Sequence, residues 1–319
     1  MKADVWIGLA CIVAVGVGCQ QSNHSNKTAI LSQSYLHKYG VPVSADEWEN
    51  AGRDGVVTST RKDGVTLSQT YTAGVLHGKT IYTFPYRDTV AHEEWYDRGI
   101  LTRRTTFETS GLPLLGESFD TPGCSTQTSW YASGSPKSIE KYQNGLLVSG
   151  EYHAPETGEI EARVEQQSGT RLTRDLFGAL VSEDLIQGGQ LIQSTSFYPN
   201  GNRKAITPYA NGKVEGQLKT FLMNGAPLSI QSWAQGGQQG TTVLMENGIV
   251  VAEIPYAKGE KMGTERRFNQ KGELVEEITW KRDVRHGPTR YHVGNQIQTQ
   301  WYEGGREVSQ AAFENKYIH

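Results

Sequence analysis

The sequence predicts an all-β fold, an elongated, twisted, single-layer antiparallel meander of repeated β-hairpins. Three observations predict it: a repeat of about 24 residues, turn-forming pairs at short intervals, and alternation of side-chain type between the turns. The composition agrees, because 36 of the 319 residues are glycine and 36% are hydrophobic. Such a composition favours many turns and a thin core.

The repeat is clearest between residues 209 and 304. Each unit begins with an aromatic residue three positions before a turn residue, and a glycine follows four positions later. These aromatic residues are Tyr209, Trp233, Tyr256 and Trp280. A second turn inside each unit leaves segments of about 6–8 residues, the length of a strand. The pattern begins earlier, at Tyr71, and degenerates between 151 and 197, where spaced glycines still predict hairpins.

Turn chemistry and side-chain alternation support these hairpins. Asn-Gly and Asp-Gly pairs readily adopt the positive φ angles of a type I′ turn. They occur at 54–55, 63–64, 144–145, 200–201, 211–212, 224–225 and 247–248. The segment 274–280 alternates between two sets of side chains, which predicts one half-buried face. We expect roughly 18–22 strands about 4.8 Å apart, in a sheet that coils because large open sheets rarely stay flat.

The repeat units resemble the bacterial MORN-like repeat family, whose signature is Tyr-x-Asn-Gly-Lys-x-x-Gly followed by an aromatic residue. Residues 209–216 match this signature almost completely, and residues 71–78 and 256–263 match it well. The resemblance covers roughly residues 50–305 and implies the hairpin fold. It also implies an antitoxin-type or lipoprotein context.

The N-terminus predicts export and a lipid anchor. After Lys2, an apolar run of 13 residues from Val5 to Val17 is too short for a membrane span, which needs about 20, and fits a signal peptide. It ends in Gly18-Cys19, which resembles the lipobox of bacterial lipoproteins. That resemblance implies lipid attachment at Cys19 and a position outside the cytoplasm, on the periplasmic or surface side of a membrane. An ordinary cleaved signal peptide and an uncleaved anchor are the alternatives.

Four segments are therefore expected. They are a lipoprotein signal peptide at 1–19, a flexible tether leading into the array at 20–45, the MORN-like hairpin array at 46–305 and a C-terminal tail at 306–319. Ser44 and Glu47 have the spacing of a capping box, which predicts a short helix over 45–51. This is the single helix expected after the signal peptide, and residues 39–43 are expected to form a short strand before it.

Composition and motifs exclude several kinds of function. The net charge of −3 lacks the basic excess of a nucleic-acid-binding protein. The phosphate-binding loop, Gly-x-Ser-x-Gly, His-Glu-x-x-His and EF-hand patterns are all missing from the sequence. We therefore predict no catalytic residue, no cofactor, no metal site and no small-molecule substrate.

Single chemically active residues have simple structural interpretations. His77 and His286 share a repeat position with Glu, Gln and Met, which indicates a surface turn position rather than a metal ligand. The pairs Glu93-Glu94 and Glu276-Glu277 lie in predicted strands, so their side chains point to opposite faces. Cys124 follows Pro122-Gly123 in a predicted loop and has no placeable base, so we interpret it as an inert or mildly reactive thiol.

The aromatic residues allow two interpretations. We favour packing across strands on the apolar face of the sheet. A partner-binding stripe is the alternative, and a face that no second layer covers could serve both purposes.

The sequence favours a non-enzymatic, membrane-anchored scaffold that binds a protein or an envelope polymer whose identity it does not reveal. An antitoxin-like protein that neutralises a toxin is the first alternative, although export argues against it. An envelope hydrolase is the second, and it lacks a catalytic constellation. Direct lipid-headgroup binding is the third, and the near-neutral charge argues against attraction to anionic lipid.

Overall fold

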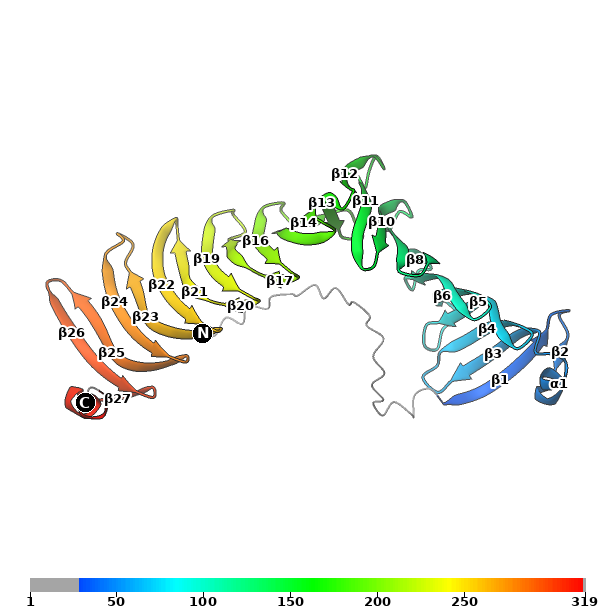
Figure 1. Ribbon diagram of the computed structural model, residues 1–319, viewed down its shortest axis with the longest axis horizontal. Coiled ribbons are helices and arrows are strands. Elements are labelled where there is room, and N and C mark those ends of the chain that lie inside the picture. The colour runs from blue at the N-terminus through cyan, green and yellow to red at the C-terminus, as the bar shows by residue number, and fades with distance from the viewer. Residues whose placement is uncertain (1–28, 318–319) are drawn as a thin grey trace.

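The computed structural model describes residues 29–317, and these form one open antiparallel sheet of 27 strands with a short helix near each end (Figure 1). Strand β1 pairs with β2 and β3, and the chain then continues as a meander to β27. The ribbon follows an arch, with β1 and α1 at one foot and β26, β27 and α2 at the other (Figure 1). The predicted all-β hairpin meander is confirmed.

The bounds of the elements follow the predicted turns. The first part contains β1 (Ile30–His37), β2 (Pro42–Val43), α1 (Ala45–Asn50), β3 (Gly55–Arg61), β4 (Thr66–Thr72), β5 (Val75–Thr83), β6 (Val90–Asp97), β7 (Ile100–Phe107), β8 (Pro113–Thr121) and β9 (Cys124–Trp130). The central part contains β10 (Pro136–Gln143), β11 (Leu146–His153), β12 (Ile160–Glu165), β13 (Ser168–Arg174), β14 (Leu180–Gln187), β15 (Gln190–Phe197) and β16 (Arg203–Ala210). The last part contains β17 (Lys213–Val214), β18 (Gly216–Phe221), β19 (Pro227–Ala234), β20 (Gly237–Gln238), β21 (Gly240–Glu246), β22 (Ile249–Ala257), β23 (Glu260–Phe268), β24 (Leu274–Lys281), β25 (Val284–Val293), β26 (Gln296–Glu303), β27 (Arg306–Val308) and α2 (Gln310–Tyr317).

The expected number of strands was too small. Two hairpins contain a break beside a positive-φ glycine, so that β17 and β18 flank Glu215, and β20 and β21 flank Gln239. A break of this kind divides one expected strand into two. A further strand, β1, lies within the segment expected to be a flexible tether, where it pairs with β3 along its length.

The predictions for the two ends of the array are confirmed in part. The helix predicted after Ser44 is confirmed as α1, and both hydrogen bonds of the capping box with Glu47 are present. The short strand expected at 39–43 is limited to β2. The expected C-terminal tail instead contains β27 and the unpredicted helix α2, whose Phe313 is buried against Trp301. Residues 1–19, with the predicted signal peptide and Cys19, lie outside the described residues.

Asn-Gly pairs form two different kinds of turn. At 144–145, 211–212 and 247–248 both residues have positive φ, as a type I′ turn requires. At 200–201 and 224–225 only the glycine has positive φ, because the pair lies inside a longer loop closed by backbone hydrogen bonds such as Tyr198 N to Asn202 O. The Asn-Gly pairs therefore predicted the positions of these turns correctly but not always their class. The turn predicted at 54–55 is wrong, because Gly55 begins β3 and the turn lies at 51–53.

The sheet has two chemically different faces. The strands are curved in Figure 1, and one face, here called the inner face, buries side chains at the centre of strands such as β23, β24 and β25. Ile278 and its cross-strand partners Glu265 and Thr289 are each no more than 1% exposed. Their neighbours along the chain belong to the opposite face, here called the outer face, which carries exposed charged side chains. The alternation predicted for 274–280 is thereby confirmed.

A cluster of buried apolar residues lies near the apex of the arch, where the sequence predicts degenerate hairpins. Leu147, Tyr152, Val164 and Ile186 form its centre, and Tyr142 and Leu172 are among the residues that pack against it. The spaced glycines of this segment, such as Gly158 and Gly178, keep the positive φ angles of turns. The central segment is therefore a packed part of the array despite its irregular sequence.

Candidate interaction surface

The turns of successive hairpins are joined by side chains at one repeat position. The residue before the second glycine of a unit accepts a hydrogen bond from a backbone N–H of the next turn on the same edge. The acceptors are Asp54 (2.6 Å from Ala73 N), His77 (3.4 Å from Arg98 N), Glu215 (2.6 Å from Gln235 N), Gln239 (2.9 Å from Lys258 N) and His286 (3.4 Å from Gly304 N). The two histidines lie near the starts of strands β5 and β25, rather than in the turns predicted for them, and accept there through Nδ1.

Four aromatic residues on the inner face are held by an acceptor two residues earlier in the same strand. The donor–acceptor pairs are Tyr96 to Glu94 (2.8 Å), Tyr142 to Glu140 (2.7 Å), Trp233 to Gln231 (3.1 Å) and Tyr302 to Gln300 (3.0 Å). Residues i and i+2 of a strand share a face, so each pair is local. This supports the packing interpretation of the aromatic residues. These acceptors were not predicted, although each stands two residues before an aromatic residue in the sequence.

Tyr131 and Tyr198 have a different role from the other aromatic residues. Each begins a longer loop, and its hydroxyl donates to a backbone carbonyl at the end of another hairpin strand, His153 O at 2.7 Å and Phe221 O at 2.9 Å. Aromatic residues therefore join neighbouring hairpins at the loops as well as on the inner face.

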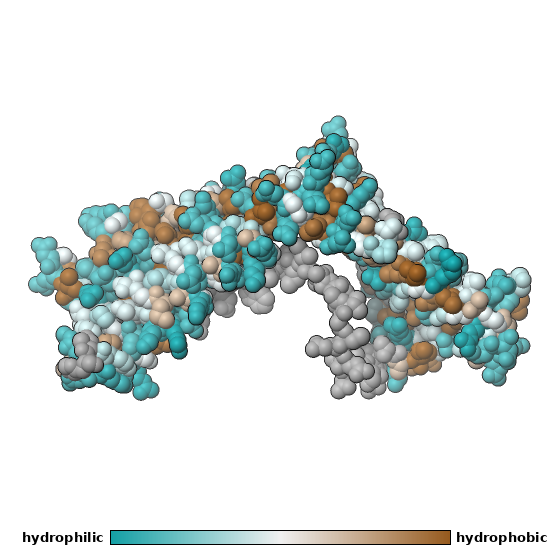
Figure 2. Space-filling model, in the orientation of Figure 1, coloured by the Kyte–Doolittle hydropathy of each residue, from teal (hydrophilic) through white to brown (hydrophobic). Residues whose placement is uncertain are grey.

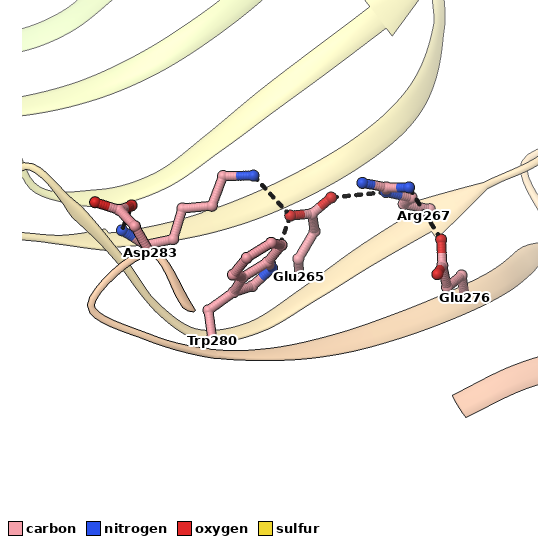
Figure 3. A network of polar contacts seen from close by, with 6 residues as sticks. Glu265, Arg267, Glu276, Trp280 and Asp283 are labelled. Atoms are coloured by element: carbon pink, nitrogen blue, oxygen red, sulfur yellow. Dashed lines mark hydrogen bonds and ion pairs between the residues drawn. The ribbon is translucent and has the colours of Figure 1, made fainter. Parts of the chain in front are cut away.

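A buried polar network lies on the inner face between β23 and β24 (Figure 3). The Glu265 carboxylate accepts hydrogen bonds from Lys261 Nζ (3.1 Å), Arg267 Nε (2.7 Å) and Trp280 Nε1 (2.9 Å). Arg267 also donates to Glu276 across the strands at 3.1 Å. Lys261 lies over the Trp280 ring, 4.5 Å from its centre. Every group in the network is thus paired within the array.

Two further carboxylates on the inner face have similar environments. Arg104 donates to one oxygen of Glu94 from Nε and Nη2, at 2.9 and 2.7 Å, and the other oxygen accepts from Tyr96 and Tyr82. In the apical part Arg171 donates two hydrogen bonds to Asp184, at 3.0 and 2.7 Å. Charge compensation at buried carboxylates therefore recurs along the array.

The environments of Glu265 and Glu94 favour the ionised carboxylate. Burial opposes ionisation of Glu265, but the hydrogen bonds from Arg267 and Lys261 outweigh it and lower its pKa. The pKa of Glu94 is lowered in the same way, against burial, by hydrogen bonds from Tyr96 and Arg104. Burial and Glu94 together raise the pKa of Tyr96 to about 12. Carboxylates that are ionised at neutral pH and paired with cations are suited to holding strands together and poorly suited to exchanging protons.

The neighbouring acidic residues separate onto the two faces as predicted. Glu94 lies in the inner network, whereas Glu93 pairs with Lys79 on the outer face. Glu276 pairs with Arg267, whereas Glu277 faces Arg266 and Arg290. Neither pair can act together on one substrate.

The outer face carries charges of both signs in cross-strand order. Glu253, Arg266, Glu277 and Arg290 are successive partners across β22 to β25, with N–O distances of 3.7–3.8 Å. These side chains are partly exposed. Such loose pairs contribute little to stability and remain available to other charged groups. Figure 2 shows hydrophilic and apolar residues interspersed over the face in view.

The structure also places Cys124 and the residues that could bind a metal. Cys124 is a half-buried free thiol at the start of β9, rather than in a loop. Between residues 29 and 317, no group of three or more His, Cys, Asp or Glu side chains is placed to hold a metal ion. Neither helix in this range is long and apolar enough to span a membrane.

Solved structures give no informative match. The chain aligns with Sqt1 of Saccharomyces cerevisiae at 10% identity and a TM-score of 0.19, over 88% of this chain and 84% of that one. BamB of Moraxella catarrhalis aligns at 11% identity and a TM-score of 0.16, over 79% and 82% of the two chains. A porin-like protein of Bacteroides uniformis aligns at 10% identity and a TM-score of 0.14, over 77% and 89%. Scores this low carry no argument about fold or function.

Sequence comparison gives one local match. No curated protein is significantly similar to this chain. The family model of the MORN repeat variant matches residues 192–211, which span β15, β16 and the start of the Asn211-Gly212 turn. Together with the hairpin geometry, this match supports a MORN-like repeat.

Proposed function

We propose that this protein is a non-enzymatic scaffold, anchored to a membrane through Cys19, whose repeat array binds another protein or an envelope polymer. The observation that carries the proposal is the uncovered outer face, on which charges of both signs stand in cross-strand order. The inner-face carboxylates of Glu94, Asp184 and Glu265 are paired with cations within the array. The outer-face charges are paired only loosely, so a partner can engage them at small cost.

The anchor is tested by intact mass and membrane fractionation of the native protein beside a Cys19→Ala variant. We expect the wild type to carry a diacylglyceryl mass increment and to partition with membranes, because acyl chains bury many methylene groups. The variant should lack the increment and the partitioning. If both forms are soluble and unmodified, the anchor is refuted.

The binding surface is tested by photo-crosslinking in cells. A photoreactive amino acid at position 264, on the outer face between these charges, should form a discrete adduct, and Arg266→Glu should reduce its yield. The same amino acid at position 223, in an exposed loop, is the control. Equal yields at the two positions, or no effect of Arg266→Glu, would refute an outer-face site.

A further inference from the structure

Exposed apolar residues gather at the N-terminal end of the array. The turn between β1 and β2 exposes Tyr39 and Val41, which are 78% and 55% accessible. Leu36 of β1 is also exposed, and Val41 and Val43 line a shallow hollow beside α1. The turn is closed by backbone hydrogen bonds, because His37 N donates to Val41 O and Gly40 N donates to His37 O, and Gly40 has a positive φ. Its apolar side chains are therefore presented outward by a rigid element.

Both cations beside this turn are paired, and the acidic residues Asp46 and Glu47 line the adjacent hollow. Lys38 pairs with Asp54 at 2.8 Å, and Arg53 pairs with Glu49. The Lys38 ammonium also lies 5.5 Å from the centre of the Tyr39 ring. An exposed tyrosine with a neighbouring lysine suits the boundary between lipid headgroups and acyl chains, where an apolar ring and a polar tip are both accommodated.

The length of the preceding chain limits how far this end can lie from the anchor. Nine residues separate Cys19 from Ala29. A fully extended chain spans at most about 3.5 Å per residue, so Ala29, the residue before β1, lies within about 35 Å of the lipidated cysteine. Exposed apolar residues occur elsewhere too, such as Ile297 at the other foot of the arch, which is 59% accessible. Proximity to Cys19 distinguishes the N-terminal end.

We infer that the β1–β2 turn, through Leu36, Tyr39 and Val41, rests in the interfacial layer of the bilayer that holds the acyl chains of Cys19. The inference rests on the proposed anchor and adds an orientation to it. The N-terminal foot of the arch then lies on the membrane, and β27 and α2 lie at the far end of the ribbon. The contact is apolar and aromatic, so it does not require anionic lipid.

The test uses the full, lipidated chain in phosphatidylcholine vesicles that contain lipids with an acyl-chain nitroxide quencher. A fluorescent amino acid is placed at position 39 or, as the matched control, at position 297. We expect severalfold stronger quenching at position 39 than at 297. With the fluorescent residue at position 36, the double substitution Tyr39→Ser and Val41→Ser should reduce quenching to the level of the control.

Different results would identify different errors. A chain that stays in the aqueous fraction without the diacylglyceryl mass increment would refute the anchor. A chain that carries the increment but is quenched equally at positions 39 and 297 would refute the membrane contact and leave the anchor intact. Strong quenching at position 36 that is unchanged by the double substitution would also refute it, because tether length alone would then explain the proximity.

Discussion

At the scale of single residues, the array combines polar and apolar burial in one layer. The inner face places Glu265, Glu94 and Asp184 among aromatic and aliphatic side chains, and cross-strand or neighbouring cations compensate each of them. Removing one partner of such a network leaves buried polar groups without partners. Ion pairs on the outer face are exposed to solvent, so they contribute much less to stability.

Substitution of Glu265 tests this difference. Glu265→Ala removes the acceptor of three hydrogen bonds, and we expect a loss of roughly 2–3 kcal/mol in the free energy of local unfolding of β23 and β24. Hydrogen exchange of the β23 and β24 amides measures it. The matched control is Glu253→Ala on the neighbouring outer face, where we expect a change within about 0.5 kcal/mol. Equal losses would contradict a structural role for the inner network.

The lowered pKa of Glu265 predicts a pH dependence of stability. Folding favours the ionised carboxyl, so its contribution is present above the unfolded pKa of roughly 4.3 and is lost as the pH falls through the lower folded pKa. The difference in urea stability between wild type and Glu265→Gln should therefore be largest at neutral pH and shrink with acidification. A difference that stays constant, or grows, as the pH falls would refute the assignment.

At the scale of elements, regular units could be predicted from the sequence because their turns and alternation are local signals. Asn211-Gly212 and the segment 274–280 are examples. Which acids are buried could not be predicted, because Glu265 and Glu253 look alike until the strand register is known. Helix α2 was missed because it has little amphipathic pattern and buries one side chain, Phe313. Its Ser309, whose hydroxyl accepts from Ala312 N, was a usable start signal.

The docking of α2 depends on Phe313, which contacts Trp301 and His286. An isolated helix of this length is unstable, so Phe313→Ala should unfold it, because losing a buried Phe costs roughly 3–5 kcal/mol. Hydrogen exchange should show lost protection over 310–317 and unchanged protection in β24. Tyr317→Phe keeps the ring beside His286 and removes only the hydroxyl that donates to Glu303, so it should leave α2 protected. Retained protection in Phe313→Ala would contradict this account.

At the scale of the whole molecule, each hairpin contacts its sequence neighbours, and the apical cluster is the largest group of buried apolar side chains. Stability should therefore be a sum of local terms, as in other repeat arrays, rather than the property of one shared core. Each end of the arch has its own aromatic packing: Trp48 packs on Tyr35 and Tyr71 at one end, and Phe313 packs on Trp301 at the other.

Leu147→Ala tests whether a destabilising substitution affects only the neighbouring hairpins or the whole sheet. Leu147 is buried in the apical cluster, and its truncation should cost roughly 2–5 kcal/mol. If stability is local, hydrogen exchange should accelerate in β10 to β14 and stay unchanged in β3 to β5 and β23 to β25, which are several hairpins away. The exposed Leu185, on β14, provides the matched control, because Leu185→Ala should leave all three regions unchanged. Uniform acceleration across the array in Leu147→Ala would show that the sheet unfolds as one unit. The hairpins would then be too strongly coupled for the array to behave as independent repeats.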